Sequence, residues 1–242
     1  MIFLVYGQQK SASTFLANLA RQSCFAAGSN PDAIKKCLFT GELEKKRDFW
    51  DGTLSELNQI ASQLNETEHT SVKTHSRFQP CYATELNHPQ IKIMMSYRHP
   101  GDAALSAYEA GEKARQNNLP WEWASLMNHR DAIDAMADFL EKQTIPWLKS
   151  GLATAFDYDT LTRNSEVVID HLAQALKTTS DQLMAYPDLA ALLEGKTRVY
   201  NFNKGIAGRH QEVFSQKDLA YLEERCGPFI RFCNKDIGRD AL

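Results

Sequence analysis

The sequence lacks the features that mark several common kinds of site. Its five cysteines are scattered, and no two of them form a C-x-x-C pair. Its seven histidines include no H-E-x-x-H motif or comparable ligand spacing. This pattern argues against structural zinc and favours a reducing compartment. We therefore expect a cytoplasmic protein that holds no metal.

Long apolar runs, basic tails and repeats are also missing. The apolar start at residues 2–6 is too short for a signal peptide and follows no basic segment, and no transmembrane segment is evident. The net charge is −3, and no stripe of basic and aromatic residues is present, so we expect no nucleic acid partner. The 242 residues contain no linker or low-complexity segment, which predicts a single domain over 1–242.

The hydrophobic pattern alternates between short buried runs and amphipathic stretches. The pattern predicts strands at 2–6, 70–74, 91–96 and 152–157, and helices at 13–26, 54–64, 100–116, 121–142, 164–176 and 215–225. Such alternation indicates an α/β fold of three layers, with a central, mainly parallel sheet flanked by helices. Lys10, His75, Arg98 and Tyr158 each follow a predicted strand, where sites of such sheets lie, so we expect them to share one site.

The loop after the first predicted strand contains small polar residues and one lysine, and it leads into a helix. Backbone N–H groups and a helix N-terminus converge in such loops and hold phosphate. The nucleoside triphosphate version, G-x-x-x-x-G-K-[ST], would place its lysine at position 13, where this chain has Ser13. The only lysine of the loop is Lys10. The loop therefore predicts a phosphate site, but not one for a triphosphate.

This loop, Lys10-Ser11-Ala12-Ser13-Thr14-Phe15, resembles the P-K-S-G-T-T-W loop of the PAPS-dependent sulfotransferases. The resemblance implies a P-loop-like fold and a loop that holds the 5′-phosphosulfate of PAPS. Gln9 replaces the usual proline. Ala12 replaces a glycine, which is tolerated where the local φ is negative. Phe15 stands where the family has a tryptophan that stacks on adenine.

Two further segments resemble the parts of this family that bind the 3′-phosphate. In the first, Arg98 and Ser106 have the spacing of an arginine and a serine that grip the 3′-phosphate. The second, residues 201–214, resembles R-K-G-x-x-G-x-x-x-x-x-F. Its candidate nucleotide-binding residues are Asn203, Lys204, Gly205 and Arg209. Asn203 stands in place of the family's arginine, and Arg209 could supply the missing charge from another place on the loop.

Two more stretches complete the resemblance. Residues 70–75 look like the K-T-H stretch of the cytosolic sulfotransferases, with Lys73 and His75. An imidazole titrates near neutral pH and can take a proton from an acceptor hydroxyl, and a lysine can stabilise charge on the transferring group. Residues 158–161 are similar to the Y-E-D-L segment, in which the tyrosine lies by the adenine; Tyr158 has that position.

The resemblance implies transfer of a sulfuryl group from PAPS to a hydroxyl or amine of a small-molecule, glycan or lipid acceptor, with PAP as product. His75, Lys10 and Lys73 would be catalytic. One alternative is a P-loop kinase, which needs the absent loop lysine and an aspartate for Mg²⁺, for which Asp157 and Asp159 are weak candidates. Another is a PAPS- or PAP-binding protein without turnover. Lys73 and His75 argue against it, whereas Asn203 keeps it open.

Overall fold

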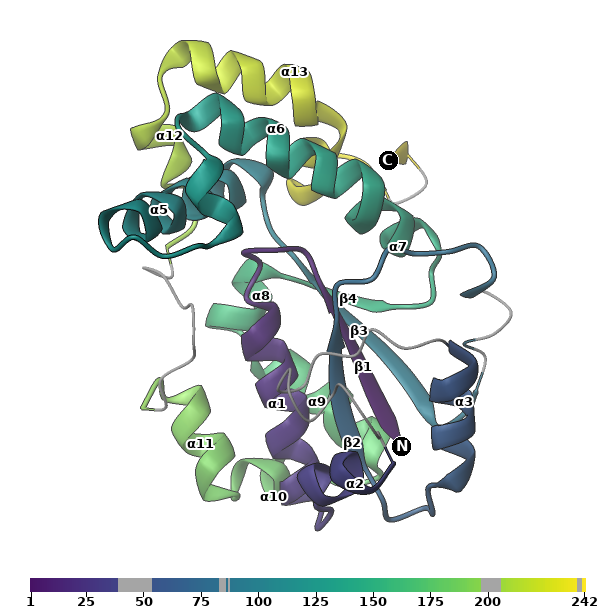
Figure 1. Ribbon diagram of the computed structural model, residues 1–242. Coiled ribbons are helices and arrows are strands. Elements are labelled where there is room, and N and C mark those ends of the chain that lie inside the picture. The colour runs from purple at the N-terminus through teal and green to yellow at the C-terminus, as the bar shows by residue number, and fades with distance from the viewer. Residues whose placement is uncertain (39–53, 83–85, 87, 197–205, 239–240) are drawn as a thin grey trace.

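The structure is a computed structural model that describes residues 1–38, 54–82, 86, 88–196, 206–238 and 241–242 (Figure 1). Its strands are β1 (Ile2–Gly7), β2 (Thr70–Thr74), β3 (Ile91–Tyr97) and β4 (Thr154–Asp157). Its helices are α1 (Ser13–Ala26), α2 (Pro31–Leu38), α3 (Leu54–Gln63), α5 (Pro100–Gln116), η2 (Glu122–Ser125), α6 (His129–Phe139), η3 (Leu140–Thr144), α7 (Ile145–Lys149), α8 (Tyr158–Arg163), α9 (Glu166–Leu176), α10 (Ser180–Met184), α11 (Pro187–Leu193), α12 (His210–Val213) and α13 (Gln216–Cys233).

The four strands form one parallel sheet in the order β2-β1-β3-β4. All four predicted strands are confirmed, although β4 begins at Thr154 rather than at 152. The register pairs Gly7 with Ser96 and Tyr97 with Asp157, so the carboxyl ends of neighbouring strands lie side by side. This edge of the sheet is where a ligand site is expected in such a fold.

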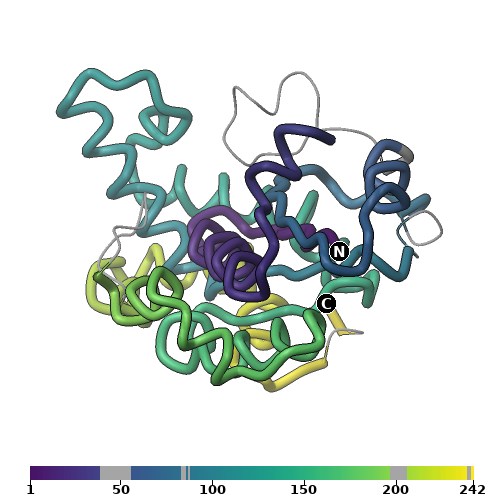
Figure 2. The backbone as a smooth tube through the Cα atoms, turned by 90° about the horizontal axis from the view of Figure 1, so that it is seen from below, coloured from purple at the N-terminus to yellow at the C-terminus, as the bar shows by residue number. Residues whose placement is uncertain are grey.

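Strand β1 is buried on both faces of the sheet. Ile2, Leu4 and Tyr6 belong to one apolar core, and Phe3 and Val5 to the other. Helices α1, α9, α10 and α11 stack together on the face of Phe3 and Val5 (Figures 1 and 2). Covering both faces explains why the strand is a continuous apolar run rather than an alternating one, and the predicted three layers are confirmed.

A layer formed by α5, α6, α12 and α13 lies over the carboxyl ends of the strands (Figure 1). In Figure 2 the far end of α5 and the turn after it extend away from the sheet. No helix in the part of the chain that the structure describes is long and apolar enough to cross a bilayer.

The helix predicted over 121–142 is not continuous. The segment begins as the short η2, leaves helical geometry at Leu126, and starts α6 only at His129. Asn128 has an extended backbone, and its side-chain oxygen accepts a hydrogen bond from the N–H of Asp131, which is how an asparagine starts a helix. The apolar periodicity runs through this break because the residues on both sides pack against α5.

Other helices depart from the expected ranges. Helices α2, α10 and α11 have no counterpart in the prediction, because each is shorter than two and a half turns and gives little periodic signal. Helix α13 continues to Cys233, eight residues beyond the predicted end at 225. It passes through Pro228, which the sequence pattern favours as a stop.

Candidate functional site

The phosphate loop joins β1 to α1 in a tight turn. A Cβ at Gly7 would lie 1.9 Å from the Cβ of Ser13, so only glycine allows the start of α1 to come this close to the strand. Ala12, the N-cap of α1, has φ 64°, and Lys10 has φ 66°. The negative φ under which Ala12 would be tolerated is therefore not found, and the alanine is in the left-handed region that the family's glycine would occupy without strain.

Ser11 anchors this loop to the neighbouring strand. Its hydroxyl donates to the carbonyl oxygen of Gln8 at 2.6 Å and lies 2.7 Å from the Ser96 hydroxyl on β3. The Gln8 side chain is also buried, and its Oε1 accepts a hydrogen bond from the Arg98 backbone N–H at 2.8 Å. Gln8 was not singled out from the sequence. It joins the loop directly to the residue predicted to bind the 3′-phosphate.

Arg98 connects three segments that are distant in the sequence. It is only 8% exposed. Its Nη1 donates to the carbonyl of Lys10 at 3.4 Å and its Nη2 to the carbonyl of Ile206 at 3.0 Å, while its guanidinium lies 3.8 Å from the centre of the Tyr158 ring. Its buried Nε has no hydrogen-bond partner among the described residues. Arg98, Lys10 and Tyr158 are thus brought together, as expected from their positions after strands.

Burial and like charge act on the cations of this site. Burial lowers the pKa of Lys10, and the nearby charge of Arg98 lowers it further. Burial also lowers the pKa of Arg98 from its ordinary value. Positive charges that are held close together and partly shielded from water attract an anion strongly.

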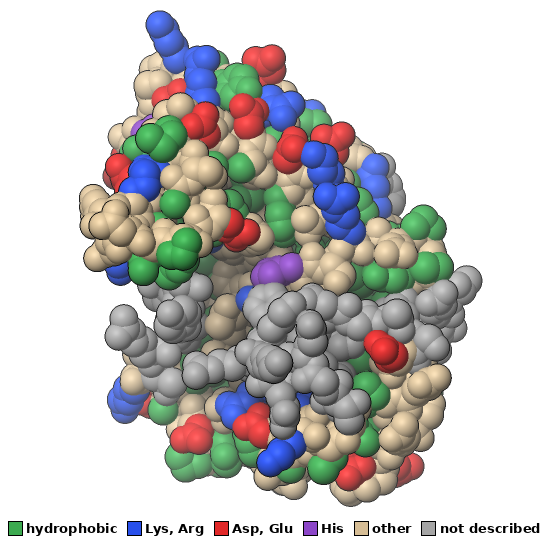
Figure 3. Space-filling model, viewed as in Figure 1, with side chains coloured by type: hydrophobic (Ala, Val, Ile, Leu, Met, Phe, Trp, Pro, Cys, Tyr) green, Lys and Arg blue, Asp and Glu red, His purple; other side chains and the backbone are tan. Residues whose placement is uncertain are grey.

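Lys73 and His75 lie at the end of β2, beside the phosphate loop. The buried Lys73 donates from Nζ to the Thr14 hydroxyl at 3.0 Å. His75 Nδ1 lies 3.0 Å from the carbonyl oxygen of Gly7. Because a carbonyl only accepts, Nδ1 carries the proton and the basic lone pair is on Nε2. Figure 3 shows a histidine side chain at the surface near the junction of the upper helical layer with the lower part of the molecule.

Trp147 on α7 supports the segment that carries His75. Its indole N–H donates to the carbonyl of Ser76 at 3.0 Å, and its ring, only 1% exposed, stacks on Tyr6 at 5.3 Å between centroids. Phe78 and Tyr82 contact the same ring. The sequence offered no signal for this contact, because 71 residues separate Trp147 from Ser76.

A second polar cluster joins α5 to the segment before α12. One oxygen of the buried Asp102 accepts from the Gly208 N–H at 2.7 Å, and the other lies 2.9 Å from Nδ1 of His210. Burial alone would raise the pKa of Asp102, but these two hydrogen bonds, together with the nearby charge of Arg98, lower it to about 2. His99 stacks on His210 with 4.4 Å between ring centroids.

Some of the other residues predicted to bind the nucleotide lie within the described part of the chain, and some lie outside it. Arg209 forms a bidentate ion pair with Glu109 on α5. Ser106 is buried on α5, and Phe15 packs partly buried against the core of α1. Asn203, Lys204 and Gly205 lie outside the described residues. For all of these, binding of a nucleotide stays a prediction.

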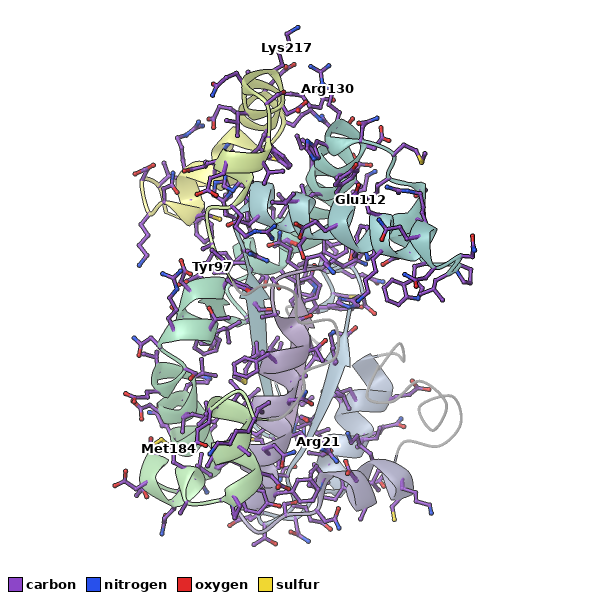
Figure 4. All side chains as sticks on the ribbon, turned by 90° about the vertical axis from the view of Figure 1, so that its left-hand side faces the viewer. Arg21, Tyr97, Glu112, Arg130, Met184 and Lys217 are labelled. Carbon is purple, nitrogen blue, oxygen red and sulfur yellow. The ribbon has the colours of Figure 1, made fainter. Side chains whose placement is uncertain are left out.

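A cleft of about 960 Å³ opens between α8 and the helical layer. Arg98, Tyr158, Asp102 and Gly208 line one part of it, and residues of α13 line the other. Tyr97, which also lines the cleft, lies at this junction in Figure 4. Lys10 and His75 are not among the lining residues. Arg98 therefore stands between this cleft and the phosphate loop, since it also contacts Lys10.

Several solved structures of other proteins have a fold similar to this one. Mouse sulfotransferase SULT7A1 complexed with PAP matches over 99% of this chain and 86% of its own, with a TM-score of 0.60 and 16% identity. The fold is that of the sulfotransferases. Retinol dehydratase in complex with retinol and PAP matches over 92% of this chain and 79% of its own, with a TM-score of 0.53 and 14% identity. Its complex with androsterone and PAP matches with a TM-score of 0.52 and 15% identity, over 92% of this chain and 78% of its own.

Comparison of the amino-acid sequence alone does not detect this similarity to the sulfotransferases. No protein-family model matches the chain, and no curated protein matches it. The resemblance read from the short motifs is confirmed at the level of the fold by the structural match. At these identities the likeness establishes the fold alone, so the activity is argued from the site.

Proposed function

We propose that this protein is a sulfotransferase that transfers the sulfuryl group of PAPS to a hydroxyl or amine. In this reaction the acceptor oxygen or nitrogen forms a bond to sulfur, and the bond between sulfur and the oxygen of the 5′-phosphate breaks. The acceptor proton passes to a base of the protein, and PAP leaves. The reaction needs a cradle for two phosphate groups, a base, and cations beside the transferring group.

The observation that carries this proposal is Arg98. A buried guanidinium whose Nε has no partner among the described residues is costly unless an anion or polar ligand reaches it. One N–H of Nη1 and one of Nη2 donate to the carbonyls of Lys10 and Ile206, one from each loop that the resemblance assigns to the nucleotide. A phosphate beside Arg98 would be held by a planar guanidinium fork, the geometry that suits it best.

The base in this proposal is His75. The Gly7 carbonyl orients its ring and directs the lone pair on Nε2 away from the loop backbone. Lys10 and Lys73 would offset charge that develops on the bridging and equatorial oxygens, with Lys73 held by Thr14 of the phosphate loop. All three side chains lie at the same edge of the sheet, which a group-transfer reaction requires.

The acceptor in this proposal is a small molecule. Retinol dehydratase, which has a similar fold, has been solved with retinol and PAP and with androsterone and PAP, which supports this class of acceptor. A glycan or a lipid remains the alternative class. We also propose a cytoplasmic location, since the five cysteines form no disulfide with one another, as is usual in a reducing compartment.

The kinase alternative gains no support from the site. Both oxygens of Asp157 are used at the start of α8, where they accept hydrogen bonds from the N–H and the hydroxyl of Thr160, each at 2.8 Å. Asp157 is therefore an N-cap residue, which accounts for its position without a magnesium ion. Asp159 is exposed and lies near Arg163.

Replacement of His75 tests the proposal. His75→Ala should reduce PAP formation from PAPS by at least about 100-fold, the usual contribution of a general base, while PAP affinity stays within about twofold. His88→Ala, at the opposite end of the sheet, is the matched control and should keep full turnover. Unchanged turnover in His75→Ala, or loss of PAP binding in it, would contradict the role of His75.

A further inference from the structure

Helix α5 presents two carboxylates to the segment that leads into α12. Asp102 and Glu109 are seven residues apart, which is two helical turns, so they lie on one face of the helix. Both contact the short stretch from Gly208 to His210. The two carboxylates hold this stretch in different ways.

Asp102 holds the backbone on both sides of Arg209. It accepts from the N–H of Gly208 at 2.7 Å and from the N–H of His210 at 3.3 Å, and it also contacts the His210 ring. The side chains of Asp102 and His210 are only 2% and 5% exposed. A buried, multiply bonded carboxylate of this kind fixes the position of the main chain at Arg209.

Glu109 contacts the side chain of Arg209 rather than its backbone. Nη1 of Arg209 lies 3.1 Å from Oε2 of Glu109, and Nη2 contacts Oε1. Their side chains are 16% and 23% exposed, so water reaches this pair more readily than it reaches Asp102. The guanidinium can therefore change its partner while the backbone beside it stays in place.

The pair also lies close to the cations of the proposed nucleotide site. Burial and the charge of Arg98 lower the pKa of Lys10, and the charge of Glu109 partly offsets this lowering; burial lowers the pKa of Arg98, and the charge of Arg209 adds to that effect. Glu109 is thus a carboxylate within electrostatic reach of Lys10 and Arg209, at the end of the site where phosphate is expected. A negatively charged carboxylate at this position would repel a bound phosphate and would therefore weaken nucleotide binding.

We propose that Glu109 is an internal substitute for a nucleotide phosphate: it pairs with Arg209 in the empty protein and yields Arg209 to a phosphate of bound PAPS or PAP. This inference rests on the proposed function. A phosphate dianion carries more charge and more acceptor oxygens than a carboxylate, so it can displace Glu109 from the guanidinium. No covalent bond changes in the exchange. Its consequence is that Glu109 lowers nucleotide affinity and keeps the product from binding too tightly.

The first test compares Glu109→Gln with Glu112→Gln for PAP affinity, measured by calorimetry. Glu112 is one turn further along the same helix (Figure 4) and accepts from the Tyr108 hydroxyl, so its replacement removes the same charge without touching Arg209. Glu109→Gln should bind PAP about fivefold more tightly than wild type, which is the order expected when a partly exposed ion pair no longer competes. Glu112→Gln should stay within about twofold. Weaker binding by Glu109→Gln would overturn the inference, and misfolding cannot produce the expected gain.

The second test separates exchange of Arg209 from a general effect of charge. Arg209→Gln should weaken PAP binding, and adding Glu109→Gln to Arg209→Gln should then change the affinity by less than about twofold. A gain that persists without Arg209 would overturn the exchange, because Glu109 would then act only through its field. If wild-type protein binds no PAP, the proposed function fails together with this inference. If wild type binds PAP and the cycle shows no coupling, only this inference fails.

Discussion

At the scale of single residues, Ala12 holds a backbone conformation that its side chain makes unfavourable. With φ at 64° it is in the left-handed region, and it caps α1 without a side-chain hydrogen bond. Ala12→Gly should stabilise the protein by about 0.5–1 kcal/mol, because relief of the strain exceeds the added entropy of the unfolded glycine. Urea denaturation measures this change.

Lys177→Gly provides the matched control for that prediction. Lys177 has φ 56° at the end of α9, away from the phosphate loop, and its replacement should stabilise the protein by a similar amount. If Lys177→Gly stabilises the protein and Ala12→Gly destabilises it, the prediction for Ala12 is contradicted, and the loop needs the alanine for a reason other than backbone strain.

Sequence reasoning predicted where the charged residues of the candidate site lie better than it predicted the residues that contact them. Lys10, His75 and Arg98 could be found because parallel strands deliver the residues that follow them to one edge of the sheet. Gln8 and Trp147 could not be found, because their contacts join segments that are 90 and 71 residues apart. No periodicity in the chain encodes such pairings.

At the scale of elements, α7 acts on the site through Trp147. Trp147→Phe removes the only N–H of the side chain, leaves the Ser76 carbonyl without this donor, and opens space beside Tyr6. We expect a loss of about 2 kcal/mol in the free energy of unfolding, measured by urea denaturation. Turnover should also fall, with PAP affinity unchanged, because the segment of His75 is less firmly held. Full turnover in a destabilised Trp147→Phe protein would contradict the link to His75.

The elements of the sheet were predicted more reliably than the helical layer. The four buried strands are distinct apolar runs, and their positions came out within two residues of the predicted starts. The break at Leu126 was missed because it depends on how η2 packs against α5. A Cβ at Gly111 would lie 2.1 Å from the carbonyl oxygen of Trp123, and that close approach is a tertiary contact that a helical pattern does not reveal.

At the scale of the whole molecule, buried histidines should limit stability in acid. Burial and the nearby His210 together lower the pKa of His99 to about 4, and burial also lowers the pKa of His69 to about 4. Because the unfolded histidines take up protons near pH 6.5, stability is fully present above this pH and is lost as the pH falls toward about 4. His99→Gln should reduce this loss by up to about 3 kcal/mol, as measured by urea denaturation from pH 7 to pH 4.

The same experiment has an internal check. Asp102, with its pKa lowered to about 2, stays ionised in the folded protein throughout the window, and because the unfolded carboxyl takes up protons only near pH 4, it contributes to the slope only at the acid end. An unchanged loss of stability in His99→Gln would contradict the assignment to His99 and leave His69 and His171, whose pKa values burial also lowers, as sources.

The most direct test of the whole account is calorimetric binding of PAP to the wild-type protein, with AMP and ATP–Mg²⁺ as comparators. The buried Arg98 and its open Nε predict that PAP binds at least about tenfold more tightly than AMP, because charge-assisted hydrogen bonds to the 3′-phosphate are worth about 1.5–3 kcal/mol. Equal affinity for PAP and AMP, or a preference for ATP–Mg²⁺, would contradict the sulfotransferase proposal.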